Sequence, residues 1–219
     1  MGYSYGGHFN SFNYGVRIIM KDTYNTINKP SDPVLYKDKN SKFYGYAFPL
    51  SHEDDLNQIL EQLKSDHKSA GHFCYAYQMG TDSLKYRVND DGEPSNSAGM
   101  PIYGQIQSFD VTNIVVIVIR IFGGTKLGVG GLISAYKTAA KLALENSKII
   151  SKTIDKKFLL EFDYKYMSKV MRLIHQLNAK IHEQQMEMTC SFEVAVRQRD
   201  AQKFKKTFET YFGVTVKEV

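Results

Sequence analysis

The sequence predicts an α+β protein, with an N-terminal α/β domain followed by a small C-terminal domain of βαββαβ order. Three observations lead to this fold class. Hydrophobic residues make up 42% and charged residues 23% of the 219 residues, as in ordinary globular proteins. Runs with strand alternation are interspersed with runs of helical period. All five prolines lie at or before Pro101, and after Gly131 the only glycine is Gly213, so turns concentrate in the first part.

The elements of the first part follow from the spacing of apolar residues. Residues 52–68 carry leucine and isoleucine at helical intervals, and Ser51 is placed as the N-cap of this predicted helix. A further helix opens near Gly131, directly after a glycine-rich loop. Strands are predicted at residues 41–51, 72–79, 83–88 and 114–122. The last of these is a β-branched run of the kind found in a central strand that is covered on both faces.

The pattern starts afresh near residue 146. Apolar residues recur at helical spacing in two segments and alternate in four others. The predicted order is a strand at 158–164, a helix at 166–177, strands at 179–186 and 189–196, a helix at 200–211 and a strand at 214–218. This βαββαβ order is that of a ferredoxin-like fold. We therefore expect domains at 21–145 and 146–219.

Residues 1–20 are interpreted as a flexible leader. They are rich in Gly, Tyr, Phe, Ser and Asn and lack the apolar centre of a signal peptide, and a second start at Met20 would omit most of them. The longest fully apolar run in the chain is six residues, 114–119, whereas a membrane-spanning helix needs about 20. No membrane segment is expected, and a cytoplasmic location follows by default. The two cysteines, without a CxxC motif, argue against a disulfide scaffold and a zinc finger.

The positive charge of the chain is unevenly distributed. Residues 1–145 contain 14 basic and 14 acidic side chains, whereas residues 146–219 contain 14 basic and 9 acidic ones. The whole excess of +5 therefore lies in the C-terminal third. A basic surface favours RNA or another polyanion, although a solvated helix face explains many such excesses.

An acidic loop is the first stretch that could carry chemistry. Asp90, Asp91 and Glu93 place three carboxylates within four residues, and these repel one another unless a cation or bulk water compensates. Mg²⁺ is one such cation, and the three residues are its candidate ligands. They are also the catalytic candidates if the protein is an enzyme, together with His72. The alternative is a solvated turn in which Ser95 and Ser97 cap the following helix.

A glycine-rich loop is the second such stretch. It follows a buried strand and opens a helix, so its backbone N–H groups and the helix dipole could face a phosphate or a macromolecule. The alternative is that these glycines only allow positive φ and close packing. The spacing matches neither GxxxxGK[ST] nor GxGxxG. The candidate binding residues of the two loops and the adjoining strand are Asp91, Glu93, Ser95, Arg120, Gly123, Gly124, Lys126, Gly128, Gly130 and Gly131.

Single histidines and tyrosines give weaker signals. His72 stands in an alternating strand beside Cys74, and no serine or aspartate partner can be assigned to a catalytic triad. Tyr75 and Tyr77 share one face of the same strand. They would either stack on RNA bases or pack in the core.

Four sequence blocks resemble the YigZ/IMPACT family. They are SKFYGYAFPL at 41–50, AGHFCYAYQMG at 70–80, DDGEPSNSAGMPI at 90–102 and NIVVIVIRIFGGTKLGVGGLISAYKTAA at 113–140. The resemblance covers about residues 20–143, and the C-terminal pattern fits the second domain of bacterial members. Asn96 stands where the family usually has glycine, and Ile121 where it usually has an aromatic residue.

The resemblance implies a fold more than a reaction. The N-terminal domain should be similar to the second domain of ribosomal protein S5, and the C-terminal domain to the ferredoxin-like end of elongation factor G. Eukaryotic relatives restrain a starvation-response kinase by competing for its activator. They pair the same N-terminal domain with a different companion domain, so that partner does not transfer to this chain.

Two functional hypotheses remain open. In the first, the protein is a binding or regulatory factor of translation, with the ribosome, RNA or a translation-related protein as its partner. The two loops and the basic C-terminal domain would supply the contacts. In the second, it is an enzyme acting on a phosphorylated or nucleotide ligand. The glycine-rich loop would then hold phosphate, Asp90, Asp91 and Glu93 would hold Mg²⁺ or act as a base, and Arg120 and Lys126 would offset developing charge.

Overall fold

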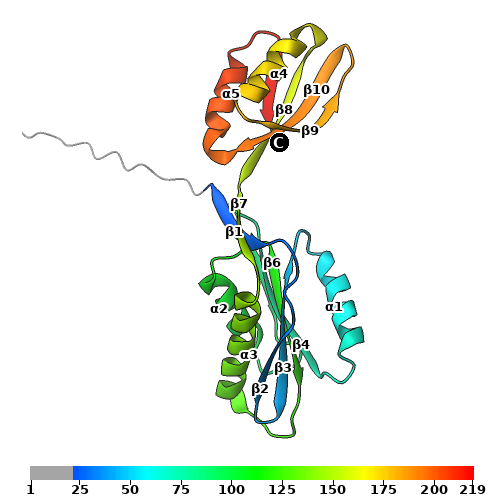
Figure 1. Ribbon diagram of the computed structural model, residues 1–219, viewed down its shortest axis with the longest axis vertical. Coiled ribbons are helices and arrows are strands. Elements are labelled where there is room, and N and C mark those ends of the chain that lie inside the picture. The colour runs from blue at the N-terminus through cyan, green and yellow to red at the C-terminus, as the bar shows by residue number, and fades with distance from the viewer. Residues whose placement is uncertain (1–21) are drawn as a thin grey trace, which may run out of the picture.

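The computed structural model describes residues 22–219, so the predicted leader at residues 1–20 lies outside the described residues. The described chain forms two bodies, each with its own sheet, and a two-stranded ribbon lies between them (Figure 1). This arrangement confirms the predicted α+β fold class. The predicted domain limits, 21–145 and 146–219, stay a prediction.

The first body contains β2 to β6 and α1 to α3. In chain order, the elements before β7 are β1 (Thr23–Ile27), which belongs to the ribbon, and then β2 (Val34–Asp38), β3 (Ser41–Pro49), α1 (Asp55–Asp66), β4 (His72–Met79), β5 (Lys85–Asn89), α2 (Gly99–Ser108), β6 (Ile114–Ile121) and α3 (Gly128–Glu145). The five strands pair in the order β2-β3-β6-β4-β5, and every pairing is antiparallel.

Strand β6 is the centre of this sheet and is covered on both faces, as its β-branched sequence predicts. Its side chains alternate between two hydrophobic clusters. Val116 and Val118 pack with α2 and α3, whereas Val115 and Ile117 pack with α1 on the opposite face. Figure 1 shows the same layers, with α1 on one side of the sheet and α2 and α3 on the other.

Two tyrosines of β4 belong to the core rather than to a surface. Tyr75 and Tyr77 are each 4% exposed and pack in the cluster beneath α1. The Tyr77 hydroxyl donates a hydrogen bond to the Glu53 carboxylate at 2.8 Å, and burial together with this carboxylate raises the pKa of Tyr77 to about 12. Neither ring is available to stack on an RNA base, so the packing interpretation of this pair is the one that the structure supports.

The ribbon between the bodies joins distant parts of the chain. Strand β7 (Ile149–Thr153) pairs antiparallel with β1, with Thr23 opposite Thr153. Asp22 and Arg197 add an ion pair at 2.7 Å. Three strands differ from the sequence prediction, since β1, β7 and the edge strand β2 were not predicted. β1 and β7 pair with each other across the whole first body, so neither has a neighbouring segment in the sequence that marks it as a strand.

The second body has the predicted ferredoxin-like topology. Its elements are β8 (Asp155–Asp163), the short 3₁₀ helix η1 (Tyr164–Tyr166), α4 (Met167–Gln176), β9 (Lys180–Gln185), β10 (Thr189–Arg197), the short 3₁₀ helix η2 (Gln198–Asp200), α5 (Ala201–Glu209) and β11 (Val214–Glu218). The strand order is β11-β8-β10-β9, with antiparallel pairs throughout. Both helices pack on one face of the sheet, where Ile174, Phe204 and Phe208 meet Phe158 and Phe192.

The helix starts differ from the sequence prediction. Ser51 does not cap α1, because residues 51–54 form a turn and the helix begins only at Asp55. Ser95 and Ser97 do not cap α2 either. The N-cap position of α2 is Ala98, and the Ser97 hydroxyl donates to the Pro94 carbonyl oxygen at 2.6 Å. In the part of the chain that the structure describes, every helix is too short or too polar to span a bilayer.

Candidate functional site

One end of the five-stranded sheet brings the two predicted loops together. The start of β4, the end of β5 and the end of β6 meet there, along with the start of α2 and Tyr136 of α3. Glu93 of the acidic loop is the link. Its Oε1 atom accepts a hydrogen bond from Arg120 Nη1 at 2.6 Å and from the Tyr136 hydroxyl at 2.8 Å. The acidic loop, the end of β6 and α3 are therefore tied to one carboxylate.

The Glu93–Arg120 ion pair is buried. The two side chains are only 4% and 7% exposed. The guanidinium carbon lies 5.6 Å from the centre of the Phe43 ring and 5.4 Å from that of Phe122, so the charge is held between two aromatic faces. Arg120 Nε has no hydrogen-bond partner among residues 22–219. An ion pair so well screened from water fixes the acidic loop against the end of β6.

Cys74 and Tyr136 extend this network into the core. Cys74 Sγ lies 3.0 Å from the Asp90 carbonyl oxygen and 3.3 Å from the Tyr136 hydroxyl oxygen. Burial raises the pKa of the Cys74 thiol and of the Tyr136 phenol far above their ordinary values. Cys74 therefore stays a protonated packing group, because a reactive cysteine needs its thiolate form.

Asp90 is used to start helix α2. Its carboxylate accepts hydrogen bonds from the backbone N–H groups of Asn96, Ala98 and Gly99, at 2.8–2.9 Å. A carboxylate at this position satisfies N–H groups that have no partner within the helix and favours the positive end of the helix dipole. Asp90 thus takes the capping role that the sequence analysis gave to Ser95 and Ser97. Ser95 is exposed at the surface of the loop.

Asp91 holds the loop against the start of β4. Its Oδ2 atom accepts the Phe73 N–H at 2.6 Å, and its carbonyl oxygen accepts a hydrogen bond from His72 Nδ1 at 2.8 Å. The other ring nitrogen of His72 lies 3.9 Å from Glu93 Oε1. His72 is thus placed beside the buried ion pair, with its orientation set by the loop backbone.

The three acidic side chains do not converge. Asp90 faces α2, Asp91 faces β4, and Glu93 faces Arg120 and Tyr136. Within residues 22–219 no group of three or more His, Cys, Asp or Glu side chains is arranged to hold a metal ion. Arg120 compensates the charge of Glu93. The geometry thus gives no support to a Mg²⁺ site made by Asp90, Asp91 and Glu93.

Glycine is required in the glycine-rich loop for different physical reasons at different positions. A Cβ atom on Gly123 would lie within 2.1–2.4 Å of the backbone of Asn40 and Ser41, so close approach requires glycine there. Gly124 and Gly128 have φ of +86° and +74°, which glycine adopts without strain. Gly131 sits at the base of the first turn of α3, where an added Cβ would lie 3.1 Å from the side chain of Leu127.

Gly130 has neither reason. A Cβ atom placed there would meet nothing within 4 Å, and its φ is not positive. Gly130 is exposed in the first turn of α3, so the backbone of this turn is accessible from outside. The N-cap residue Leu127 supplies no side-chain hydrogen bond to this turn.

The surface around this turn combines apolar and cationic groups. Phe122 and Val129 are each 53% exposed, and Ile133, one turn after Val129, is 38% exposed. Lys126 is exposed on the same loop. We define the loop-end surface as the exposed parts of residues 91–95 and 122–133. Accessible backbone, apolar side chains and one lysine suit contact with a macromolecule.

Part of this site is predictable from the sequence. Glu93, Arg120 and the glycines are among the predicted candidates, whereas Phe43, Cys74 and Tyr136 were not predicted as members of the network. The available signal was their position on the inward faces of a strand or helix, which shows burial but not the partner. Lys126 lies in the loop and is not part of the buried network.

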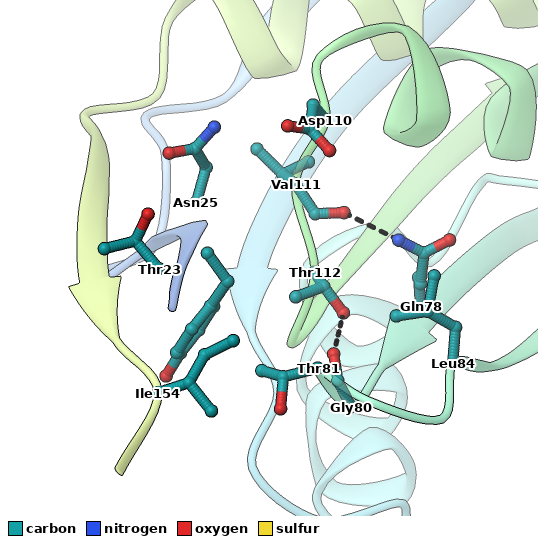
Figure 2. Close-up of a pocket in the computed structure, with 11 residues that line it drawn as sticks. Thr23, Asn25, Gln78, Gly80, Thr81, Leu84, Asp110, Val111, Thr112 and Ile154 are labelled. Atoms are coloured by element: carbon teal, nitrogen blue, oxygen red, sulfur yellow. Dashed lines mark hydrogen bonds between the residues drawn. The ribbon is translucent and has the colours of Figure 1, made fainter. Parts of the chain in front are cut away.

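A small pocket lies elsewhere, at β1 and the loop after β4 (Figure 2). Its volume is about 100 Å³, below the roughly 300 Å³ at which pockets for small molecules begin. Two of its polar contacts are internal. Gln78 Nε2 donates a hydrogen bond to the Val111 carbonyl oxygen at 3.0 Å, and the Thr112 hydroxyl donates one to the Gly80 carbonyl oxygen at 2.8 Å. This pocket is therefore too small to be the candidate site.

Comparisons with known proteins agree with this architecture. A family model described as the Impact N-terminal domain matches residues 39–144, which include the loop-end surface. The IMPACT family member YvyE of Bacillus subtilis is 26% identical over 85% of this chain and 86% of its own length. The IMPACT family member YigZ of Escherichia coli is 31% identical over 69% of this chain and 76% of its own length. A crystal structure described as that of a hypothetical protein has a TM-score of 0.72 at 24% identity, covers 90% of this chain and 98% of its own, and shares the fold.

Proposed function

Because the chain belongs to the IMPACT family, we propose that it is a binding factor of the translation machinery, with the ribosome, RNA or a translation-related protein as its partner. One observation carries the choice of a binding role over an enzymatic one. The buried Glu93–Arg120 pair ties the acidic loop to the end of β6, where the glycine-rich loop begins, and the carboxylates of Asp90, Asp91 and Glu93 all serve internal contacts. The acidic loop is thus a rigid support for a surface.

The translation assignment rests on two further features. The resemblance implies that both domains are similar to parts of translation proteins, and the strand order β11-β8-β10-β9 is the one expected for the second of them. The excess of positive charge in residues 146–219 suits a partner rich in phosphate. A cytoplasmic location is part of this proposal.

The loop-end surface would make the specific contact. Its glycines let a partner approach the backbone at the start of α3, and its exposed apolar side chains supply area that association can bury. Lys126 would contact phosphate or an acidic side chain. A loop held by a buried ion pair loses little conformational freedom on binding, which favours affinity.

Gly130→Ala tests this surface. We expect the variant to co-sediment with purified bacterial ribosomes about tenfold more weakly than the wild type, because a methyl group would block access to the backbone. Its stability should stay the same or rise by up to about 1 kcal/mol. Gly104→Ala is the matched control, because Gly104 lies in α2 and a Cβ atom there also meets nothing within 4 Å. The control should gain stability and bind normally.

Three results would contradict the proposal or part of it. If the wild type does not co-sediment with ribosomes or bulk RNA even at low salt, the translation role is wrong. If Gly130→Ala binds like the wild type, the loop-end surface is not the contact. If Lys126→Ala leaves the salt dependence of binding unchanged, Lys126 does not touch phosphate.

The enzymatic alternative has its own readout. The melting temperature of each protein is compared with and without Mg²⁺ and ATP. If these ligands stabilise the wild type but not Asp91→Ala, the enzymatic alternative is favoured over the binding proposal. We expect no such stabilisation, because the Asp91 carboxylate is occupied by the Phe73 N–H.

A further inference from the structure

The positive charge of the C-terminal body is concentrated on its two helices. Helix α4 carries Lys169 and Arg172 and no carboxylate. Helix α5 carries Lys203, Lys205 and Lys206 against Glu209 alone. The two helices therefore account for a net charge of +4, whereas the rest of residues 146–219 contributes only +1.

The two faces of this body differ in how their charges are compensated. On the sheet face opposite the helices, Lys157 pairs with Glu193 at 2.6 Å, and Lys217 pairs with Glu161 at 3.3 Å. On the helices, one lysine has a partner, Lys205 with Glu209 at 3.9 Å. Four exposed cations form no ion pair within residues 22–219, and we call them the basic helical face: Lys169, Arg172, Lys203 and Lys206.

The helices lie side by side on the same side of the sheet. Val170 and Ile174 of α4 pack in one cluster with Phe204 and Phe208 of α5, so the opposite, solvent-facing sides of both helices form one surface. Figure 1 shows α4 and α5 together over the strands of this body. The four unpaired cations thus share one side of the molecule, where like charges repel unless a polyanion neutralises them.

The remaining chemistry of this surface favours phosphate over a protein partner. Within residues 22–219, none of the exposed large hydrophobic side chains lies on α4 or α5. Protein interfaces usually have an apolar core, whereas contacts to a nucleic-acid backbone use lysine and arginine with serine, threonine and glutamine. Exposed neighbours of this latter kind are present, namely Ser168, Gln176, Gln202 and Thr210.

We propose that the basic helical face binds the phosphate backbone of RNA, a proposal that rests on the translation role proposed above and names the contact for it. Each of the four cations replaces counterions on the phosphates when it binds. The open face of the sheet, which RNA-binding domains of similar size often use for stacking, offers less free positive charge than the helices, because Lys157 and Lys217 each pair with a glutamate there.

Two exposed aromatic rings indicate which form of RNA fits. Tyr164 is 62% exposed just before α4, and Phe212 is 91% exposed just after α5. A Cβ atom on Gly213 would lie 2.3 Å from the Tyr166 ring, so the chain after α5 packs against the chain before α4. Both aromatic residues therefore lie at one end of the helical layer. Exposed rings stack on unpaired bases, and we infer that single-stranded RNA binds better than duplex RNA.

A charge-matched pair of variants tests the proposal in the full chain. The probe is a fluorescein-labelled 20-nucleotide oligouridylate, and its anisotropy is followed from 50 to 200 mM KCl. Lys203→Gln/Lys206→Gln should weaken binding at least tenfold and make the salt slope shallower by about 1.4, because two phosphate contacts are lost. Lys157→Gln/Lys217→Gln removes the same charge from the sheet face and should change binding by less than about twofold, because both lysines are already paired.

Ribosome co-sedimentation, run in parallel, separates the two proposals. Suppose that the wild type binds ribosomes, that Lys203→Gln/Lys206→Gln binds them equally well, and that neither protein binds oligouridylate. The RNA inference is then overturned and the translation role stands. Binding to neither overturns both. Equal weakening by the two double variants shows general attraction to net charge and overturns the assignment to the helices.

Two more probes settle the class of partner. If polyglutamate binds more tightly than oligouridylate, and Lys203→Gln/Lys206→Gln abolishes this binding, the partner of the helices is an acidic protein instead. If duplex RNA binds as tightly as oligouridylate, and Phe212→Ala binds oligouridylate as tightly as the wild type does, the aromatic rings do not contact the RNA. We expect oligouridylate to bind more tightly than either competitor, and Phe212→Ala to weaken it severalfold.

Discussion

At the scale of single residues, the Glu93–Arg120 pair has the largest consequences. Both side chains are almost fully buried, each charge is compensated by the other, and Glu93 also accepts a hydrogen bond from Tyr136. Breaking a buried pair leaves an uncompensated charge, which typically costs about 3–5 kcal/mol, whereas exposed pairs contribute about 1 kcal/mol or less. The pair is therefore a structural requirement of the site rather than a free reagent in it.

Glu93→Ala should lower the free energy of unfolding by about 3–5 kcal/mol, because Arg120 stays charged and buried without a partner. Urea denaturation measures the loss. Glu161→Ala is the control, because it truncates the same side chain in an exposed pair with Lys217, and it should cost less than about 1 kcal/mol. A loss at Glu93 no larger than that of the control would show that the ion pair does not hold the loops.

Cys74 predicts how stability depends on pH. Burial, aided by the Glu93, Asp91 and Asp90 carboxylates, raises the pKa of its thiol in the folded protein above the ordinary value of 9.0. The stabilisation from keeping the thiol protonated is fully present below pH 9 and is lost as pH rises toward the folded-state pKa, because only the unfolded chain ionises there. The urea midpoint should therefore fall between pH 8 and pH 10.5.

Cys74→Ala should make this fall smaller, whatever its effect on stability at pH 8. Tyr136, whose pKa burial also raises, would retain part of the dependence in the variant. An equally steep fall in the variant and the wild type would mean that Cys74 ionises in the folded protein.

At the scale of elements, the start of helix α2 is stabilised by Asp90, which lies nine positions before the first residue of the helix, Gly99. Asp90→Ala removes the acceptor of three backbone N–H groups and should cost about 1–2 kcal/mol, with faster hydrogen exchange at the start of α2. Ser95→Ala is the control and should change stability by less than about 0.5 kcal/mol. If Ser95→Ala were the more damaging of the two, the serine cap predicted from the sequence would be right after all.

The elements also show where local pattern suffices. β4, β6 and β11 lie where alternation or a β-branched run predicts them, and α3, α4 and α5 where apolar residues recur every three to four positions. β1, β2 and β7 escaped prediction, and β1 and β7 pair with each other from opposite ends of the first body's sequence, so no neighbouring segment marks either as a strand. Helix starts were the least predictable, since the acceptor for the first turn of α2 lies outside the helix.

At the scale of the whole molecule, the two bodies have separate cores. The cluster of Phe158, Phe192 and Phe208 shares no residue with the clusters around β6. The β1-β7 ribbon and a few ion pairs are what joins them, including Lys156 with Asp82 at 2.8 Å. Separate cores favour separate cooperative units.

Calorimetry should therefore show a calorimetric enthalpy of unfolding larger than the van't Hoff value. Phe208→Ala, which empties part of one core at a cost of about 3–5 kcal/mol, should move one transition down and leave the other in place. A single transition with equal enthalpies, shifted as a whole by Phe208→Ala, would show that the ribbon couples the two bodies into one unit.

The sequence by itself determined the fold class, the ferredoxin-like order of the second domain, the family resemblance and the excess charge of the C-terminal third. These follow from periodicity, composition and motif blocks, which are properties of neighbouring residues. Only the tertiary structure decided that Glu93 compensates Arg120, that Asp90 starts α2, and that the unpaired cations share one face of two helices. The physical reason is that periodicity reports which side of an element is buried, whereas the partner of a charge depends on which distant elements the packed core brings beside it.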